Sequence, residues 1–141
     1  WTGGSAQQTF TIGISSYADS VISAMDTVSL GSTVSGVYRN YYAEGGLSLA
    51  SFSGAGVSGT NGVATFSGTW DNGVTARYNA VEAAATTAGS VVTFVDGNSD
   101  AFLFIQGGSG NSDYIAKLSN GGSGIDGITL SDGKLITTEL L

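Results

Sequence analysis

The chain alternates short apolar or β-branched stretches with Gly-rich turn signals. Residues 8–14 place Phe10, Ile12 and Ile14 at every second position, which is typical of a strand with one buried face. Residues 34–42 are rich in Val and Tyr, and residues 47–52 and 63–70 flank an Asn61-Gly62 turn signal. This spacing of strands and turns predicts a mainly β fold, either a β-sandwich or stacked sheets, in a single domain spanning residues 1–141.

The segment 101–106 has a different pattern, because it is apolar at consecutive positions. Phe102 and Phe104 belong to one face, and Leu103 and Ile105 belong to the other. A strand of this kind is normally buried on both sides of its sheet. We expect it to pair with residues 91–96 across a turn at 97–99, and we expect a further strand at 113–119.

One segment has helical character. Residues 74–88 are Ala-rich, and Val74, Tyr78, Val81 and Ala85 recur at helical spacing. The helix is expected to start near a cap at Asp71 or Asn72 and to end at Gly89. A second short helix is an option at about 17–25, with a β alternative for the same residues.

The composition narrows the classes of function. The 141 residues carry a net charge of −7 with only four Lys and Arg, so a basic footprint for nucleic acid is lacking. The chain has no Cys and no His, which removes disulfides, thiolate metal sites and the usual general base. It has no apolar run long enough for a transmembrane helix. It begins with Trp and without a signal peptide, so we expect a processed product or a piece of a longer protein.

Residues 121–129 read GGSGIDGIT and fit the calcium-binding nonapeptide G-G-x-G-x-D-x-U-x, in which Asp126 would supply oxygen to Ca²⁺. A single repeat supplies only part of a Ca²⁺ shell, and a plain turn is the alternative for the same residues. A second group of candidate Ca²⁺ ligands is Asp96, Asp100 and Asp113, if the turn at 97–99 and the Gly-rich residues 107–112 bring the three carboxylates together. Their alternative is ordinary solvated turn residues.

No catalytic arrangement is found in the sequence. Glu44 and Glu82 are the only mid-chain glutamates, and no base accompanies a Ser nucleophile. The chain is therefore expected not to be an enzyme. The aromatic residues Tyr41, Tyr42 and Trp70 are candidates for contact with another copy or with a sugar.

The residues from about 72 to 141 resemble the C-terminal module of type I-secreted RTX-type and bacterial surface-layer proteins. The resemblance rests on the Ala-rich helix, the strand pair at 91–95 and 101–104, the Asp-led strand at 113–118, the segment 128–133 and the acidic–apolar ending Glu139-Leu140-Leu141. It implies an extracellular protein at the bacterial cell surface, exported without an N-terminal signal and often dependent on Ca²⁺. The family carries several nonapeptides in tandem, whereas this chain has one full match.

Together these features predict a non-catalytic structural protein that assembles with copies of itself into a surface layer or filament, with Ca²⁺ as a candidate stabilising ion. Strands rich in Gly, Ser and Thr leave sheet edges with few charges and no proline to protect them from pairing. Two alternatives remain. One is a secretion or Ca²⁺-binding module of a larger enzyme or adhesin, and the other is a carbohydrate-binding adhesin domain with cell-surface polysaccharide as its partner.

Overall fold

The computed structural model describes residues 9–14, 16–29, 38–43, 46–68, 72–119, 125–131 and 134–139, and it gives only the backbone of 9–14, 28–29, 38–43, 119, 125–131 and 134–139. The elements in chain order are β1 (Thr9–Ile14), the 3₁₀ helix η1 (Tyr17–Asp19), β2 (Asp26–Ser29), β3 (Tyr38–Ala43), β4 (Ser48–Leu49), β5 (Phe52–Ser53), β6 (Val57–Thr60), β7 (Val63–Phe66), α1 (Val74–Ala84), β8 (Ser90–Val95), β9 (Ala101–Ile105), β10 (Tyr114–Ser119), β11 (Ile125–Ser131) and β12 (Lys134–Glu139). The expected mainly β fold is confirmed.

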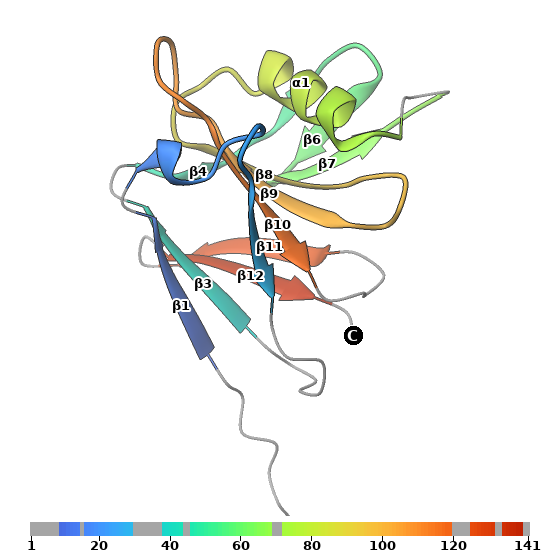
Figure 1. Ribbon diagram of the computed structural model, residues 1–141. Helices are drawn as coiled ribbons and strands as arrows, with labels where there is room; N and C mark the ends of the chain where they lie inside the picture. Colours follow the sequence, from blue (N-terminus) through green and yellow to red (C-terminus); the bar gives the residue numbers. More distant parts are fainter. Residues whose placement is uncertain are drawn as a thin grey trace, which may run out of the picture.

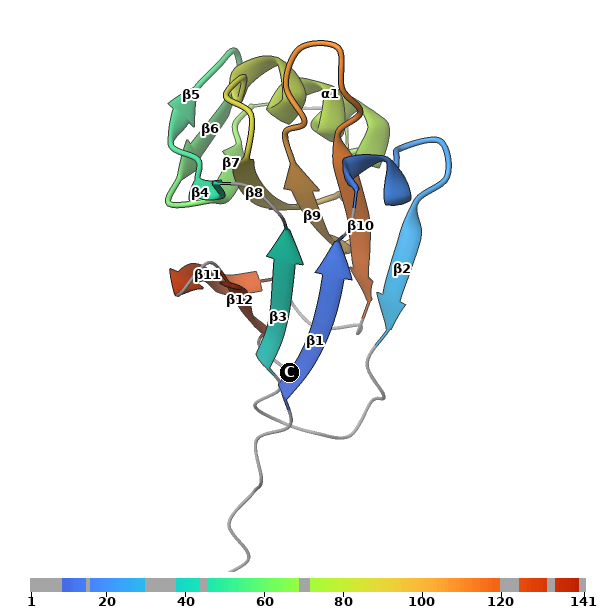
Figure 2. The ribbon, with the colours of Figure 1, turned by 90° about the vertical axis from the view of Figure 1, so that its left-hand side faces the viewer.

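The strands form two sheets (Figures 1 and 2). The large sheet has eight strands in the order β2-β10-β9-β8-β7-β6-β5, with β4 also paired to β8. The small sheet has four strands in the order β1-β3-β12-β11. The chain alternates between the sheets, because β1, β3, β11 and β12 belong to one and the intervening strands belong to the other. The two sheets are therefore joined by several crossings of the chain.

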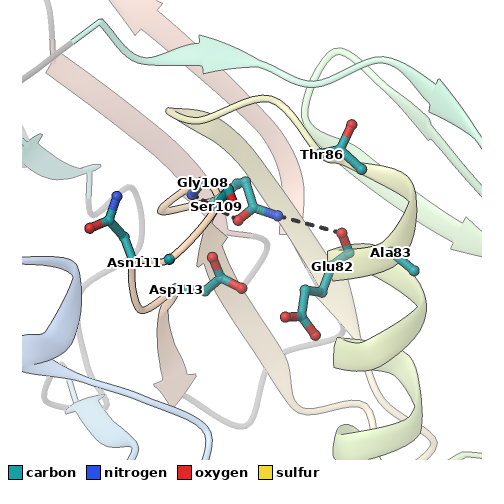
Figure 3. A pocket seen from close by; sticks show the side chains of 9 residues that line it. Glu82, Ala83, Thr86, Gly108, Ser109, Asn111 and Asp113 are labelled. Carbon is teal, nitrogen blue, oxygen red and sulfur yellow. Dashed lines mark hydrogen bonds between the residues drawn. The ribbon is translucent and has the colours of Figure 1, made fainter.

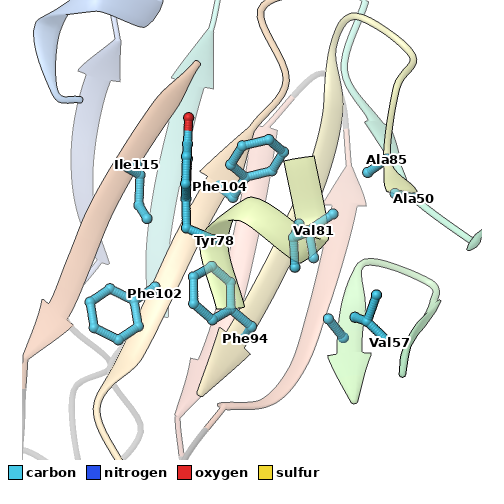
Figure 4. Close-up of a cluster of buried hydrophobic side chains, with 11 residues drawn as sticks. Ala50, Val57, Tyr78, Val81, Ala85, Phe94, Phe102, Phe104 and Ile115 are labelled. Carbon is cyan, nitrogen blue, oxygen red and sulfur yellow. The ribbon is translucent and has the colours of Figure 1, made fainter. Parts of the chain in front are cut away.

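The large sheet is the middle layer of the molecule (Figure 1). Helix α1 lies on one of its faces, and β11 and β12 pass on the other side, where β11 comes close to β4 and β8. On the helix side, Phe94, Phe102, Phe104 and Ile115 pack with Tyr78 and Val81 of α1 (Figure 4). On the opposite side, the buried cluster is Val91, Ala101, Leu103, Ile105, Tyr114, Ala116 and Leu118.

Strand β9 lies in the centre of this arrangement. Its neighbours are β8 and β10, both antiparallel, so its backbone groups are paired on both edges. Phe102 and Phe104 belong to the helix-side cluster, whereas Leu103 and Ile105 belong to the other cluster. The prediction that this strand is buried on both faces is confirmed.

Helix α1 is shorter than expected. Tyr78, Val81 and Ala85 are buried, as the helical spacing predicted, but the helix ends at Ala84, not near 88. Its N-cap is Gly73, which makes no side-chain capping bond, and Asn72 instead accepts a hydrogen bond from Arg77 (Nη2···Oδ1 2.9 Å). Asp71 lies outside the described residues. After Ala85 the chain turns back, with Ser90 N–H donating to Thr87 O (3.0 Å), so that Ser90 can begin β8.

The helix expected at 17–25 reduces to the single 3₁₀ turn η1, which is capped by Ser16 and Asp19. The reason lies at Ser20, which is completely buried against β10. Ile115 N–H donates to Ser20 O (2.9 Å), and the Ser20 hydroxyl donates to Ile115 O and accepts from Asp26 N–H (2.8 Å). These bonds draw the chain onto the sheet edge and lead it directly into β2.

The Asn61-Gly62 signal does form a hairpin, but the strand before it is β6 and not residues 47–52. Thr60 pairs with Val63, and both Asn61 and Gly62 have positive φ (48° and 79°), as such a two-residue turn requires. Residues 47–52 instead contribute β4, which pairs with β8, and the start of β5.

Candidate functional site

Asp96 and Asp100 lie together at the β8–β9 turn, as the sequence predicted. The Asp96 carboxylate accepts hydrogen bonds from Asn98 N–H and Asp100 N–H (both 2.9 Å to Oδ1). This is the local side-chain-to-backbone bonding by which Asp stabilises tight turns. Asp96 is thus the structural residue of this turn.

Asp100 has a cationic partner in the protein. Its carboxylate lies 2.6 Å from Lys117 Nζ, and the two side chains are 36% and 30% exposed. The negative charges of Asp96 and Asp100 are therefore offset within the protein, by backbone N–H donors at Asp96 and by an ammonium group at Asp100. A partly exposed ion pair of this kind contributes about 0–1 kcal/mol to stability.

Asp113 does not join these two residues. It directly precedes β10, where Tyr114 pairs with Ile105, whereas Asp100 directly precedes Ala101, which pairs with Leu118. The two carboxylates therefore lie at opposite ends of the β9–β10 pair. Among the residues whose side chains are described, no three acidic groups gather at one point. The expected three-carboxylate cluster is corrected to two separate sites.

The remaining candidates lie partly outside the described residues. Trp70 and residues 121–124 of the nonapeptide are among these, and so is Glu44. Asp126 lies in β11, at the irregular register between Ile125 and Gly127. Tyr41 and Tyr42 are successive positions of β3, and successive positions of a strand belong to opposite faces of its sheet. The two positions therefore belong to opposite faces of the small sheet.

A polar pocket lies between α1 and the loop of residues 107–112 (Figure 3). Its volume is about 480 Å³, and it is lined by Glu82, Ala83, Thr86, Gln106, Gly108, Ser109, Gly110, Asn111 and Asp113. Helix α1 supplies one wall, and the connection from β9 to β10 supplies the other. The pocket brings two carboxyl groups, Glu82 and Asp113, to the same opening.

Gln106 and Asn111 fix the walls of this pocket. The buried Gln106 amide donates to Ala85 O (3.1 Å) and Glu82 O (3.4 Å) at the end of α1, and its Oε1 accepts from Gly108 N–H (3.0 Å). Asn111 Nδ2 donates to Gly107 O (3.2 Å) within the loop. One buried amide therefore connects the helix end to the loop.

Asp113 is the buried carboxylate of the site, with 8% exposure. It accepts a short hydrogen bond from Gly107 N–H (2.7 Å to Oδ1) and a longer one from the Tyr78 hydroxyl (3.3 Å to Oδ2). Burial, the charge of Asp113 and that of Glu82 raise the pKa of Tyr78 above its ordinary value, so Tyr78 remains a neutral donor. Burial, the charge of Asp113 and hydrogen bonding with Asp113 also raise the pKa of Glu82. The charges of Glu82 and Asp113 therefore act on one another across the pocket.

Gly107 is the position where this loop tolerates no side chain. A Cβ atom there would lie 2.0 Å from Ser112 O, which is backbone and cannot swing away. We expect Gly107→Ala to lower the free energy of unfolding by about 1–3 kcal/mol through this overlap. Gly46→Ala is the control, because no heavy atom lies within 4 Å of its added Cβ. Equal denaturant midpoints for the two variants would contradict the loop geometry.

Sequence reasoning missed this site because its members come from two segments that are far apart in the chain. Glu82 was considered only as a catalytic acid, and Asp113 was assigned to the wrong neighbours. Two signals were available: Tyr78 and Glu82 are four residues apart on one helix face, and the pairing of residues 101–106 with 113–119 places Asp113 beside Gln106.

Comparison of the chain with protein-family models, curated proteins and solved structures gave no significant match. None of the helices in the described part of the chain has the length and hydrophobicity needed to cross a bilayer.

Proposed function

We propose that this chain is a non-catalytic extracellular structural subunit that assembles with copies of itself by adding strands at an open sheet edge. The observation that carries the proposal is β1. Among the strands that the structure describes, β1 is the last of the small sheet and pairs only with β3. Its six residues, TFTIGI, contain no charged residue and no proline. Natural proteins place such residues on edge strands to prevent pairing between molecules.

The other edges in the described part of the chain are better protected. At the two ends of the large sheet, β5 has only two residues, and β2 begins with the charged Asp26. At the far end of the small sheet, β11 contains Asp126 and passes close to β4 and β8. Short strands, charges and coverage each discourage pairing. These differences between the edge strands favour β1 as the edge to which a second copy adds.

The net charge of the protein affects how strongly copies associate, but it does not determine which surface they use. The net charge of −7 makes copies repel one another, and this repulsion is screened by salt. Backbone hydrogen bonds at β1 would supply the directional attraction, as in other cases of strand addition. The proposal includes Ca²⁺ as a stabilising ion and a location at the cell surface, and both of these parts come from the family resemblance.

The proposal is tested by placing a charge on the edge. Thr11 lies in the middle of β1, and we expect Thr11→Lys to weaken association at least tenfold, because a charged edge disfavours addition of a strand. Thr75→Lys is the matched control: it makes the same replacement at an exposed position of α1. Size-exclusion chromatography with light scattering, in Ca²⁺ and in a chelator, measures both variants. Equal association by the two would contradict the assignment of β1.

A further inference from the structure

The pocket between α1 and the 107–112 loop contains a carboxyl pair, Glu82 and Asp113, that the proposed assembly does not use. Glu82 extends from the helix, and Asp113 stands at the base of the loop (Figure 3). Asp113 is buried, whereas Glu82 is exposed toward the opening. Two carboxyl groups from parts of the chain that are far apart in sequence thus line one pocket.

The hydrogen bonds at Asp113 indicate which of the two carboxyl groups, Glu82 or Asp113, carries a shared proton. Two donors, Gly107 N–H and the Tyr78 hydroxyl, already point at its two oxygens. Asp113 is therefore the acceptor of the pair, and Glu82 is the group that carries the shared proton.

Few other ionisable groups face this pair in the described part of the chain. Helix α1 contributes Tyr78, and the segment from Gln106 to Ser112 contains no titratable residue. Tyr114, the neighbour of Asp113 along β10, belongs to the cluster on the opposite face of the sheet. The two cations whose side chains the structure describes have partners at the other end of the strands: Arg77 donates to Val95 O, and Lys117 pairs with Asp100. When both members of the pair are ionised, these neighbours offer no cation to offset the repulsion.

We propose that Glu82 and Asp113 form a proton-operated contact, which holds α1 against the 107–112 loop when one proton is shared and loosens when both groups are ionised. The proton comes from solvent and returns to it, with no other change in bonding. The contact makes the pocket a region whose order depends on pH. It does not depend on the proposed assembly.

The direction of the effect follows from proton linkage. The pKa of Glu82 is raised in the folded protein above the ordinary value of 4.5, so the folded state binds this proton more tightly than the unfolded state does. The resulting stabilisation is complete below pH 4.5 and is lost as the pH rises through the folded pKa of Glu82. The contact is therefore strongest in mildly acidic solution.

The test is an NMR titration of the unmodified chain and two variants. We expect the side-chain carboxyl ¹³C signal of Glu82 to titrate at a higher pH than that of an unstructured Glu. The Gly107 amide proton, which reports on Asp113, should show a step at the same pH. In Glu82→Gln the Gly107 step should disappear, and in Asp113→Asn the Glu82 midpoint should fall toward its ordinary value.

Thermal unfolding of Glu82→Gln provides an independent readout. Because glutamine donates to Asp113 at every pH, the melting temperature of the unmodified chain should fall relative to that of this variant as the pH rises above 4.5. Glu82 is exposed, so this variant is expected to fold even if Asp113→Asn does not. The proposal is overturned if Glu82 titrates as a free glutamate, or if the Gly107 step persists unchanged in Glu82→Gln.

Discussion

Replacing Phe104 by alanine is expected to lower the free energy of unfolding by about 3–5 kcal/mol. Phe104 is fully buried in β9, with 0% exposure. Its ring packs edge to face against the ring of Tyr78, with the two ring centroids 5.7 Å apart. This contact connects the central strand to α1. Strand β9 is paired on both edges, so the surrounding structure can collapse only partly into the cavity that alanine leaves. Chemical denaturation followed by circular dichroism measures the loss.

Phe52→Ala is the matched control, since it makes the same replacement at a partly exposed position of the two-residue edge strand β5. We expect it to cost clearly less than Phe104→Ala. If Phe104→Ala is too unstable to measure, Phe104→Leu, which removes fewer atoms, keeps the comparison accessible. Similar losses at the two positions would contradict the placement of the core around β9.

The second large effect is expected at Asp113. Asp113→Ala removes the acceptor for Gly107 N–H and for the Tyr78 hydroxyl, both of which are buried. A buried donor left without a partner costs about 1–3 kcal/mol, so the total loss approaches that of a core truncation. Hydrogen exchange should also show faster exchange at Gly107, because its N–H loses its partner.

Asp100→Ala makes the same chemical change at a partly exposed ion pair and serves as the comparison, where a loss of about 0–1 kcal/mol is expected. Asp113→Asn should recover part of the stability, because its amide oxygen can still accept from Gly107. An Asp113→Ala variant as stable as Asp100→Ala would show that Asp113 does not anchor the loop.

Much of the large sheet could be predicted from the sequence, because its signals are local. Consecutive apolar residues in β9 indicate burial on both faces, and the turn residues between β8 and β9 indicate their pairing. The strand expected at 113–119 is found as β10. These patterns need no knowledge of distant segments.

The errors arose where tertiary contacts override local preference. A short helix was an option for residues 17–25, but the buried Ser20 bonds to β10 and the chain enters β2 instead. The Ala-rich stretch continues past Ala84, yet Gln106 binds the last carbonyl groups and the chain must turn to reach β8. Neither contact has a signature within its own segment.

The candidate site was harder to predict because the sequence does not show which strand ends lie next to one another. Asp96 and Asp100 could be paired across one turn, whereas placing Asp113 required the register of β9 and β10. With that register, Asp113 moves away from the turn and toward Tyr78 and Glu82. The acidic residues therefore act as structural groups at two ends of the sheet.

The layered fold also relates to the proposed assembly. The large sheet has its faces covered by α1 and by the small sheet, so its apolar residues are used within one molecule. The small sheet, in contrast, ends in β1 with one side of its backbone unpaired by any described strand. A second copy that adds at this edge would leave the core unchanged.

Hydrogen exchange of the β1 backbone, measured at low and high protein concentration, tests the central claim most directly. In the single chain, amides on the unpaired side of β1 should exchange rapidly. If copies add strands at this edge, these amides should become protected as the concentration rises, while exchange in β9 stays unchanged. Rapid exchange throughout β1 at every concentration, in a protein that remains a single chain, would contradict the proposed assembly.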